Sequence, residues 1–411
     1  MMTFLNARRL HDYPRLMLIT TWIILGANLL LHQGWVGALG QVIGGDFIMF
    51  YSTGEIYRSN PGLIYDYDTQ VSTQQSLVSP TSLPGYNPFM NPPFVAPMYS
   101  LLTYLPLPWS MVIWTVMAFL CVIASAWLLI KLLPSGLLSS GFNFQQLAII
   151  TLSFFPFVEG VQSGQNHWLT LFLITGLILA TVREKWYLAG VMAGLLIYKP
   201  QFIVGFIVLW LVWRNFKAIF SFGLVAALWV GIFTLINGFE PFQTYSQLSK
   251  AFMLLPYISG FPRYLLVTFY GFTTSLLPQS AQSALYWLSQ ILFVLSLLGL
   301  AWLAYKLYHR PMAGRTPALV AALLVPLLAT PYALLHDLLI LIPGFVLCLQ
   351  FIHSRNLLYA AIITYLGAFL FTLLGVITNF PWVSLLTMGL SAGLAYWIYT
   401  NRKILLVSTQ L

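Results

Sequence analysis

Long apolar runs recur along almost the whole chain, and they constrain its fold more than any other feature. Twelve such runs occupy residues 16–33, 109–132, 147–161, 168–182, 186–198, 202–213, 219–236, 285–307, 318–334, 338–352, 357–376 and 383–399. Only 7% of the 411 residues are charged, against about 25% in ordinary soluble domains. A helix that crosses a bilayer requires about 20 apolar residues. The sequence therefore predicts an all-α polytopic membrane protein with about 12 spans, forming a single integral membrane domain over residues 1–411.

The net charge of +9 comes from Lys and Arg residues that stand singly or in pairs at the ends of apolar runs. Proteins that bind nucleic acid instead gather such residues in a patch or stripe, so we exclude that class. With the amino terminus inside, most of these cations lie on the cytoplasmic side, which satisfies the positive-inside rule. Seven of the nine acidic residues then lie outside or near the outer surface, which places the polar chemistry on the external face.

Two stretches are expected to form external loops, and two others are hard to assign as spans. Residues 34–108 form the first external loop, with a juxtamembrane helix and a re-entrant segment or short span at 92–108. Residues 237–284 form the second. The run at 186–213 is too short for two full spans, and we expect it to be broken at Lys199-Pro200, because proline ends the preceding helix.

Asp46 follows a pair of glycines in the first external loop. There its carboxylate predicts an N-cap, with Phe47, Phe50 and Tyr57 on the apolar face of an amphipathic helix at the membrane surface. A carboxylate at the edge of the bilayer is also suited to take a proton from an acceptor hydroxyl. The residues alone leave both interpretations open.

Two other polar runs are candidates for a binding site. Tyr86 and Asn87 precede a series of prolines where the chain re-enters the membrane, although an aromatic belt at the interface explains the tyrosine equally well. Gln165, Asn166 and His167 lie in a turn near the outer surface, where amides present donors and acceptors that suit sugar hydroxyls. A tight turn would use Gly and Asn in any case, but three consecutive polar side chains exceed that need.

Charged residues also lie beside apolar runs. Lys199 has no acidic neighbour in the sequence, and an ammonium in the membrane is costly unless it pairs or faces water. A phosphate group is one candidate partner, and snorkelling to the surface is the structural alternative. His336 and Asp337 lie between two predicted spans. Adjacent residues on a helix do not face each other, so both line one cavity only where the backbone is irregular, as Pro331 would allow.

These motifs, taken in order, resemble those of glycosyltransferase family 87, polytopic enzymes of the GT-C superfamily. The resemblance runs from residue 46 to about residue 290 and resumes at 330–343. Its most specific stretches are Gly164-Gln165-Asn166-His167, Leu188-Ala189-Gly190-Val191 and Tyr198-Lys199-Pro200-Gln201.

The resemblance implies a GT-C-type bundle and a donor sugar, mannose or a related one, carried on polyprenyl phosphate. It implies that Asp46 is the general base of an inverting displacement, and that Lys199, Arg263 or both neutralise the departing phosphate. The candidates for sugar and acceptor contacts are Tyr51, Tyr86, Asn87, Gln165, Asn166, His167, His336 and Asp337.

The expected acceptor is a lipid or a glycan, and the expected location is a bacterial inner membrane with the site on its external or periplasmic side. We expect no cofactor beyond the donor substrate, and no metal ion. Cys121 and Cys348 lie in apolar runs without the spacing of a zinc site. The main alternative is a lipid-linked sugar transporter or flippase. Transporters place their sites at the bilayer midplane between repeats, and no repeat is visible in this sequence.

Overall fold

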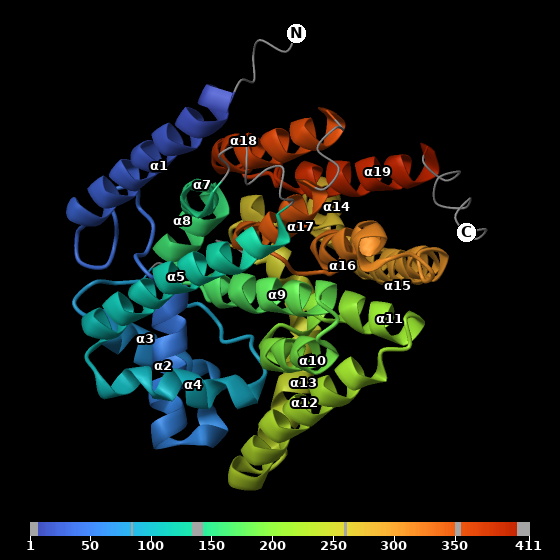
Figure 1. The fold of residues 1–411 in the computed structure, drawn as a ribbon. Helices are drawn as coiled ribbons and strands as arrows, with labels where there is room; N and C mark the ends of the chain where they lie inside the picture. The colour runs from blue at the N-terminus through green and yellow to red at the C-terminus, as the bar shows by residue number, and fades with distance from the viewer. Residues whose placement is uncertain (1–6, 84, 134–142, 259–260, 350–354, 401–411) are drawn as a thin grey trace. The chain divides into compact units, whose positions relative to one another are not determined.

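The computed structural model describes residues 7–83, 85–133, 143–258, 261–349 and 355–400, which are mostly helical (Figure 1). The chain divides into two compact units. Unit 1 comprises residues 1–126, 142–172 and 227–251, and unit 2 comprises residues 127–141, 173–226 and 252–411. Boundaries between the units therefore fall inside three α-helices, α5 (Leu107–Leu129), α9 (His167–Val182) and α12 (Phe216–Asn237), and inside the 3-10 segment η7 (Lys250–Tyr257).

Unit 1 holds the amino-terminal half of the fold. Its helices and short 3-10 segments are α1 (Ala7–Leu30), α2 (Gly45–Ser59), η1 (Pro61–Leu63), α3 (Tyr67–Val78), η2 (Pro93–Val95), α4 (Ala96–Ser100), η3 (Leu102–Tyr104), most of α5 (Leu107–Leu129), α7 (Phe144–Ser153), α8 (Phe155–Ser163), the start of α9 (His167–Val182), the end of α12 (Phe216–Asn237) and α13 (Glu240–Ser249).

Unit 2 holds the remaining elements, together with the rest of α5, α9 and α12. These elements are η4 (Ile130–Leu132), α10 (Trp186–Leu195), η5 (Leu196–Tyr198), η6 (Pro200–Phe202), α11 (Val204–Val212), most of η7 (Lys250–Tyr257), η8 (Arg263–Leu265), α14 (Phe269–Leu276), η9 (Gln279–Ala281), α15 (Gln282–Lys306), η10 (Met312–Arg315), α16 (Thr316–Ala329), η11 (Leu335–Ile340), α17 (Leu341–Cys348), α18 (Arg355–Thr378) and α19 (Ser384–Thr400).

The all-helical class is confirmed, and among the described residues six helices are long and apolar enough to cross a membrane. They are His11–Leu30, Leu107–Leu132, Phe216–Asn237, Gln279–Lys306, Met312–Ala329 and Tyr359–Thr378. A seventh span is counted if α7 and α8, which meet at a 58° bend, act as one. The expected count of about 12 is not shown, because several of the predicted runs fold into helices of 10–17 residues. The protein is an integral membrane protein.

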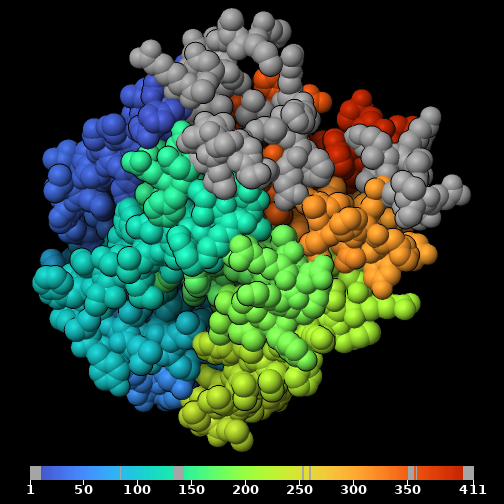
Figure 2. Space-filling model, viewed as in Figure 1, coloured from blue at the N-terminus to red at the C-terminus, as the bar shows by residue number. Residues whose placement is uncertain are grey.

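Helix α5 shows how such a span meets its surroundings. Val112, Val116 and Leu120 share one face at a spacing of four residues, and each is at least half exposed. Residues of this part of the chain form the blue-green surface in Figure 2. The opposite face, with Ala118 and Val122, is buried. An apolar face of this kind is costly in water and compatible with lipid, so we assign it to the bilayer.

Helix α2 is not the amphipathic surface helix that the sequence predicted. Phe47, Ile48, Met49 and Phe50 are all buried, so side chains on every side of its first turns are covered by protein. Apolar residues on all sides are typical of a core helix, and the prediction failed because it assigned only one apolar face. Asp46 is also not the N-cap, which is Gly44.

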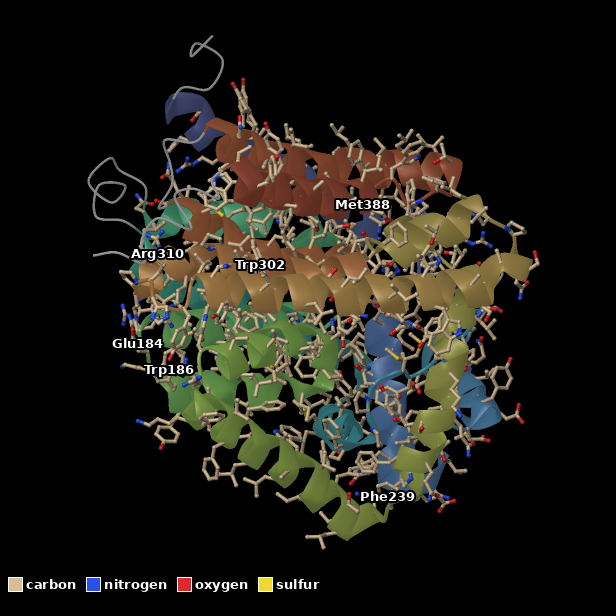
Figure 3. All side chains as sticks on the ribbon, turned by 90° about the vertical axis from the view of Figure 1, so that its right-hand side faces the viewer. Glu184, Trp186, Phe239, Trp302, Arg310 and Met388 are labelled. Atoms are coloured by element: carbon tan, nitrogen blue, oxygen red, sulfur yellow. The ribbon has the colours of Figure 1, made fainter. Side chains whose placement is uncertain are left out.

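In unit 2 the most buried candidate span is α16, which packs against α11, α15, α17 and α19. Helix α15 runs along this unit with Trp302 half exposed, and Arg310 follows just beyond its end (Figure 3). Helix α16 is apolar on all sides, so it requires neighbouring helices to cover it, and these four helices do so.

Both stretches that were hard to assign are interrupted. Between residue 92 and the start of α5 at Leu107, no helix is longer than the five residues of α4, so this part of the loop is not a full span. Between residues 186 and 213, helix α10 continues as η5 and stops at Lys199, whose extended φ of −127° precedes Pro200. The predicted break is confirmed at this proline.

Candidate functional site

Asp46 lies in the first turn of α2 and is half-buried. The amide Nδ2 of Asn87 donates a hydrogen bond of 2.5 Å to its Oδ1. Within the part of the chain that the structure describes, Asn87 is the one hydrogen-bond donor to this carboxylate, so Oδ2 is left without a donor.

The side-chain amide of Gln74 in α3 holds the backbone of Asn87 through two hydrogen bonds. Its N–H donates to Gln74 Oε1 at 3.0 Å, and its C=O accepts from Gln74 Nε2 at 2.8 Å. Gln74 is buried, so this pairing is shielded from water. The amide that contacts Asp46 therefore stands on a fixed backbone although it belongs to a loop.

Tyr99 of α4 contacts the turn that carries Asn166. Asn166 Nδ2 donates to the Tyr99 hydroxyl at 3.0 Å, and both side chains are buried. Burial raises the pKa of Tyr99, the bond from Asn166 offsets part of that rise, and the negative charge of Asp46 adds to it. We call Asp46, Asn87, Tyr99 and Asn166 the Asp46 cluster.

The turn between α8 and α9 packs directly on the start of α2. Gly164 has a φ of +77°, and a Cβ added there would lie 2.4 Å from Cβ of Phe47. Its carbonyl accepts from Trp114 Nε1 of α5 at 2.9 Å, and the Gly44 N–H donates to the carbonyl of Gln162 at 2.9 Å. Only glycine allows both this backbone conformation and this close approach.

The remaining predicted residues of unit 1 hold structure around the cluster. The Tyr51 hydroxyl donates to the Leu105 carbonyl at 2.8 Å, and the Tyr86 ring meets Tyr67 edge-on at 5.0 Å. No hydrogen bond from the described residues joins either tyrosine to the Asp46 cluster. The Gln165 Oε1 accepts from the backbone N–H of Asn166 at 3.3 Å. The buried ring of His167 lies against Gly160.

A second group of charged side chains lies in unit 2. It brings together Lys199 and Asp337, which are 138 residues apart in the sequence. Lys199 Nζ donates to Asp337 Oδ1 at 2.8 Å, and the side chains are 11% and 4% exposed. His336 Nε2 lies 3.9 Å from the same oxygen. We call Lys199, His336 and Asp337 the Lys199 cluster. Lys199 thus has a counter-ion inside the protein, which sequence proximity did not indicate.

Irregular backbone allows both His336 and Asp337 to face this cluster. Leu334 pairs with Leu266 in an isolated bridge, and Asp337 Oδ2 accepts the Leu334 N–H at 3.1 Å at the start of η11. Arg263 lies three residues before Leu266; burial raises the pKa of Tyr257, and the charge of Arg263 offsets part of that rise. No ion pair within the described part of unit 2 links Arg263 to the Lys199 cluster.

Residues 89–331 match the family model described as glycosyltransferase family 87, and this is more than half of the chain. The chain belongs to glycosyltransferase family 87. It is therefore an enzyme that transfers a sugar from a donor to an acceptor, and the resemblance inferred from the sequence is confirmed. No curated protein and no solved structure matches this family 87 chain.

The family 87 match contains only part of the candidate site. Gln165, Asn166, His167, Lys199 and Arg263 lie inside it. The other predicted residues lie outside it, before or after the matched stretch: Asp46, Tyr51, Tyr86, Asn87, His336 and Asp337. Among the residues that the structure describes, no three His, Cys, Asp or Glu side chains are grouped so that they could hold a metal ion.

Tyr99 and Gln74 contact residues of the candidate site of this family 87 enzyme, but they were missed from the sequence. Tyr99 stands among apolar residues of the 92–108 stretch, and its ring stacks on Phe50 with 4.4 Å between centroids. Gln74 is one of several polar residues on α3. Neither residue has a local signal of function, because each acquires its role from a partner far away in the sequence.

Proposed function

We propose that this family 87 enzyme is an inverting transferase. It moves mannose or a related sugar from a polyprenyl-phosphate donor to a lipid or glycan acceptor at the external face of the membrane. The observation that carries this proposal is the Asp46 carboxylate, which has one oxygen on Asn87 and the other without a donor among the described residues. The distribution of Lys and Arg supports the external side.

In the proposed step, Asp46 Oδ2 takes the proton of the acceptor hydroxyl. At the same time, the oxygen of that hydroxyl attacks the anomeric carbon of the donor sugar. The bond from the anomeric carbon to the phosphate oxygen breaks, and polyprenyl phosphate leaves with the electron pair from the opposite side. The new glycosidic bond therefore has inverted configuration. Phosphate is a good leaving group, so the step requires no second carboxylic acid, unlike the hydrolysis of glycosides.

Asn166 is suited to position a hydroxyl of the sugar or the acceptor. Its Oδ1 is buried and accepts no hydrogen bond from the described residues, while its Nδ2 is engaged with Tyr99. A buried amide oxygen without a partner costs free energy, and a substrate hydroxyl would recover it.

Lys199 is suited to bind the phosphate of the donor, because an ammonium provides three donors and a positive charge.

Transfer by the purified protein tests this function. We expect the protein, reconstituted in phospholipid vesicles, to move labelled mannose from polyprenyl-phosphate mannose to extracted membrane glycolipids. NMR of the product should show an anomeric configuration opposite to that of the donor. Retained configuration, or transfer from a nucleotide sugar and none from the lipid-linked donor, would contradict the proposal.

Lys199→Met tests the assignment of the donor phosphate. We expect the KM for the donor to rise at least about tenfold, because an ammonium that contacts phosphate contributes more than about 1.4 kcal/mol. The KM for the acceptor should change little. Lys250→Met removes an exposed lysine and is the matched control. An unchanged KM for the donor in Lys199→Met would mean that Lys199 has a structural role and does not bind the donor phosphate.

A further inference from the structure

Both carboxylate oxygens of Asp337 are engaged within the protein. Oδ1 accepts from Lys199 Nζ at 2.8 Å, and Oδ2 accepts the N–H of Leu334 at 3.1 Å. The side chain is 4% exposed. A carboxylate in this state has little left to offer a sugar hydroxyl, so the contacts of Asp337 do not favour the sugar-binding role expected from the sequence. Its charge acts instead on Lys199.

The charge of the substrate changes during the proposed reaction. The phosphodiester of the donor carries one negative charge, whereas the monoester that leaves carries about 1.5 to 2 at neutral pH. A lone ammonium attracts the more highly charged ion more strongly, particularly where burial lowers the dielectric. Lys199 without a counter-ion would therefore hold the product more tightly than the donor, and release would become slow.

We propose that Asp337 is a positioning residue that holds the Lys199 ammonium and balances its charge, so that the departing polyprenyl phosphate is released. This inference rests on the proposed function, in which Lys199 meets the phosphate. The neutral pair attracts a phosphate less than lysine alone, and the hydrogen bond orients Nζ before the donor arrives. Phe202, whose ring centre lies 5.9 Å from Nζ, and His336 lie beside this pair.

The decisive experiment measures binding of farnesyl phosphate by Asp337→Asn in detergent. Asparagine has nearly the same shape and keeps one acceptor oxygen, which can accept from Lys199 or from Leu334, but it removes the negative charge. We expect farnesyl phosphate to bind about tenfold more tightly than to the unsubstituted protein, with kcat and the KM for the donor both lowered. A residue with a merely structural role would give weaker binding, so weaker or unchanged binding overturns the inference.

Three comparisons make the result specific. Asp337→Glu keeps the charge and should bind farnesyl phosphate about as the unsubstituted protein does. Asp68→Asn removes an exposed carboxylate of α3 and should leave binding unchanged. If Lys199→Met binds farnesyl phosphate normally, the phosphate role of Lys199 in the proposed function is wrong. If Lys199→Met binds it weakly and Asp337→Asn does not bind it more tightly, only the inference about Asp337 is wrong.

The unsubstituted protein provides a test that does not depend on the folding of any variant. Because the pair is neutral overall, we expect farnesyl phosphate and its methyl diester to bind with affinities that differ by less than about tenfold. The two ligands share the same chain and differ mainly in charge. A preference for the monoester well above tenfold would mean that Asp337 does not balance Lys199, and would overturn the inference.

Discussion

Replacing Asp46 with asparagine is expected to lower the rate of sugar transfer about a thousandfold, within the range usual for loss of a general base. The amide keeps the size of the side chain and can still accept the bond from Asn87 through its oxygen. It cannot take the proton of the acceptor hydroxyl. The KM for the donor should change little, because the phosphate is proposed to bind elsewhere. Initial rates with labelled polyprenyl-phosphate mannose measure the effect.

Glu55→Gln is the matched control for this substitution. Glu55 lies on the same helix and is also half-buried, but the structure gives it no contact with the Asp46 cluster among the described residues. We expect this variant to keep most of the transfer rate. If Glu55→Gln were inactive and Asp46→Asn active, the base would be Glu55, and the proposed mechanism would be wrong at its central residue.

Gly164→Ala is expected to have the second largest effect, because it affects both folding and catalysis. An alanine there has a positive φ of 77° and places its Cβ against Phe47, the residue after Asp46. Strain in the left-handed region and overpacking together predict a loss of roughly 2 to 6 kcal/mol of stability. A shift of about 1 Å in a catalytic group can cost a hundredfold in rate, so transfer should fall accordingly. Thermal unfolding in detergent and the transfer assay measure both effects.

Gly40 provides the control for the backbone strain alone. Its φ is also positive, at 79°, but a Cβ added there meets nothing within 4 Å. Gly40→Ala should therefore lower stability by only about 1 kcal/mol and leave transfer nearly unchanged. If Gly164→Ala behaved like Gly40→Ala, the turn between α8 and α9 would not position Asp46, and its contact with Phe47 would be incidental.

The membrane-spanning helices and the candidate site differ in how far the sequence predicted them. Each of the twelve apolar runs contains helix, since an apolar run in lipid has few other ways to satisfy its backbone. Their lengths were overestimated because hydropathy does not register a break where neighbouring residues stay apolar. The bend between α7 and α8, which lies within the apolar run at 147–161, is an example. Helix α2 was predicted on the surface because its apolar residues were assigned to one face, whereas its first turns are buried on all sides.

The residues of the candidate site contact partners that lie far away in the sequence, and the sequence alone did not reveal these contacts. Asp46, Asn87, Asn166 and Lys199 were all selected as candidates from their residue types and positions. The pairing of Asp46 with Asn87, across 41 positions, depends on how α3 places a loop against α2. Tyr99 was missed because a tyrosine among apolar residues is usual at a membrane interface.

The residues by themselves determined the class of this protein, its membrane location and its family. These properties depend on composition, on the period of apolar runs and on short motifs, all of which are local along the chain. Only the tertiary structure decided which charges meet. It gave Lys199 a buried counter-ion in Asp337 and left one oxygen of Asp46 without a donor among the described residues. The physical reason is that a charge inside a membrane protein requires a nearby partner, and packing supplies that partner from distant parts of the chain.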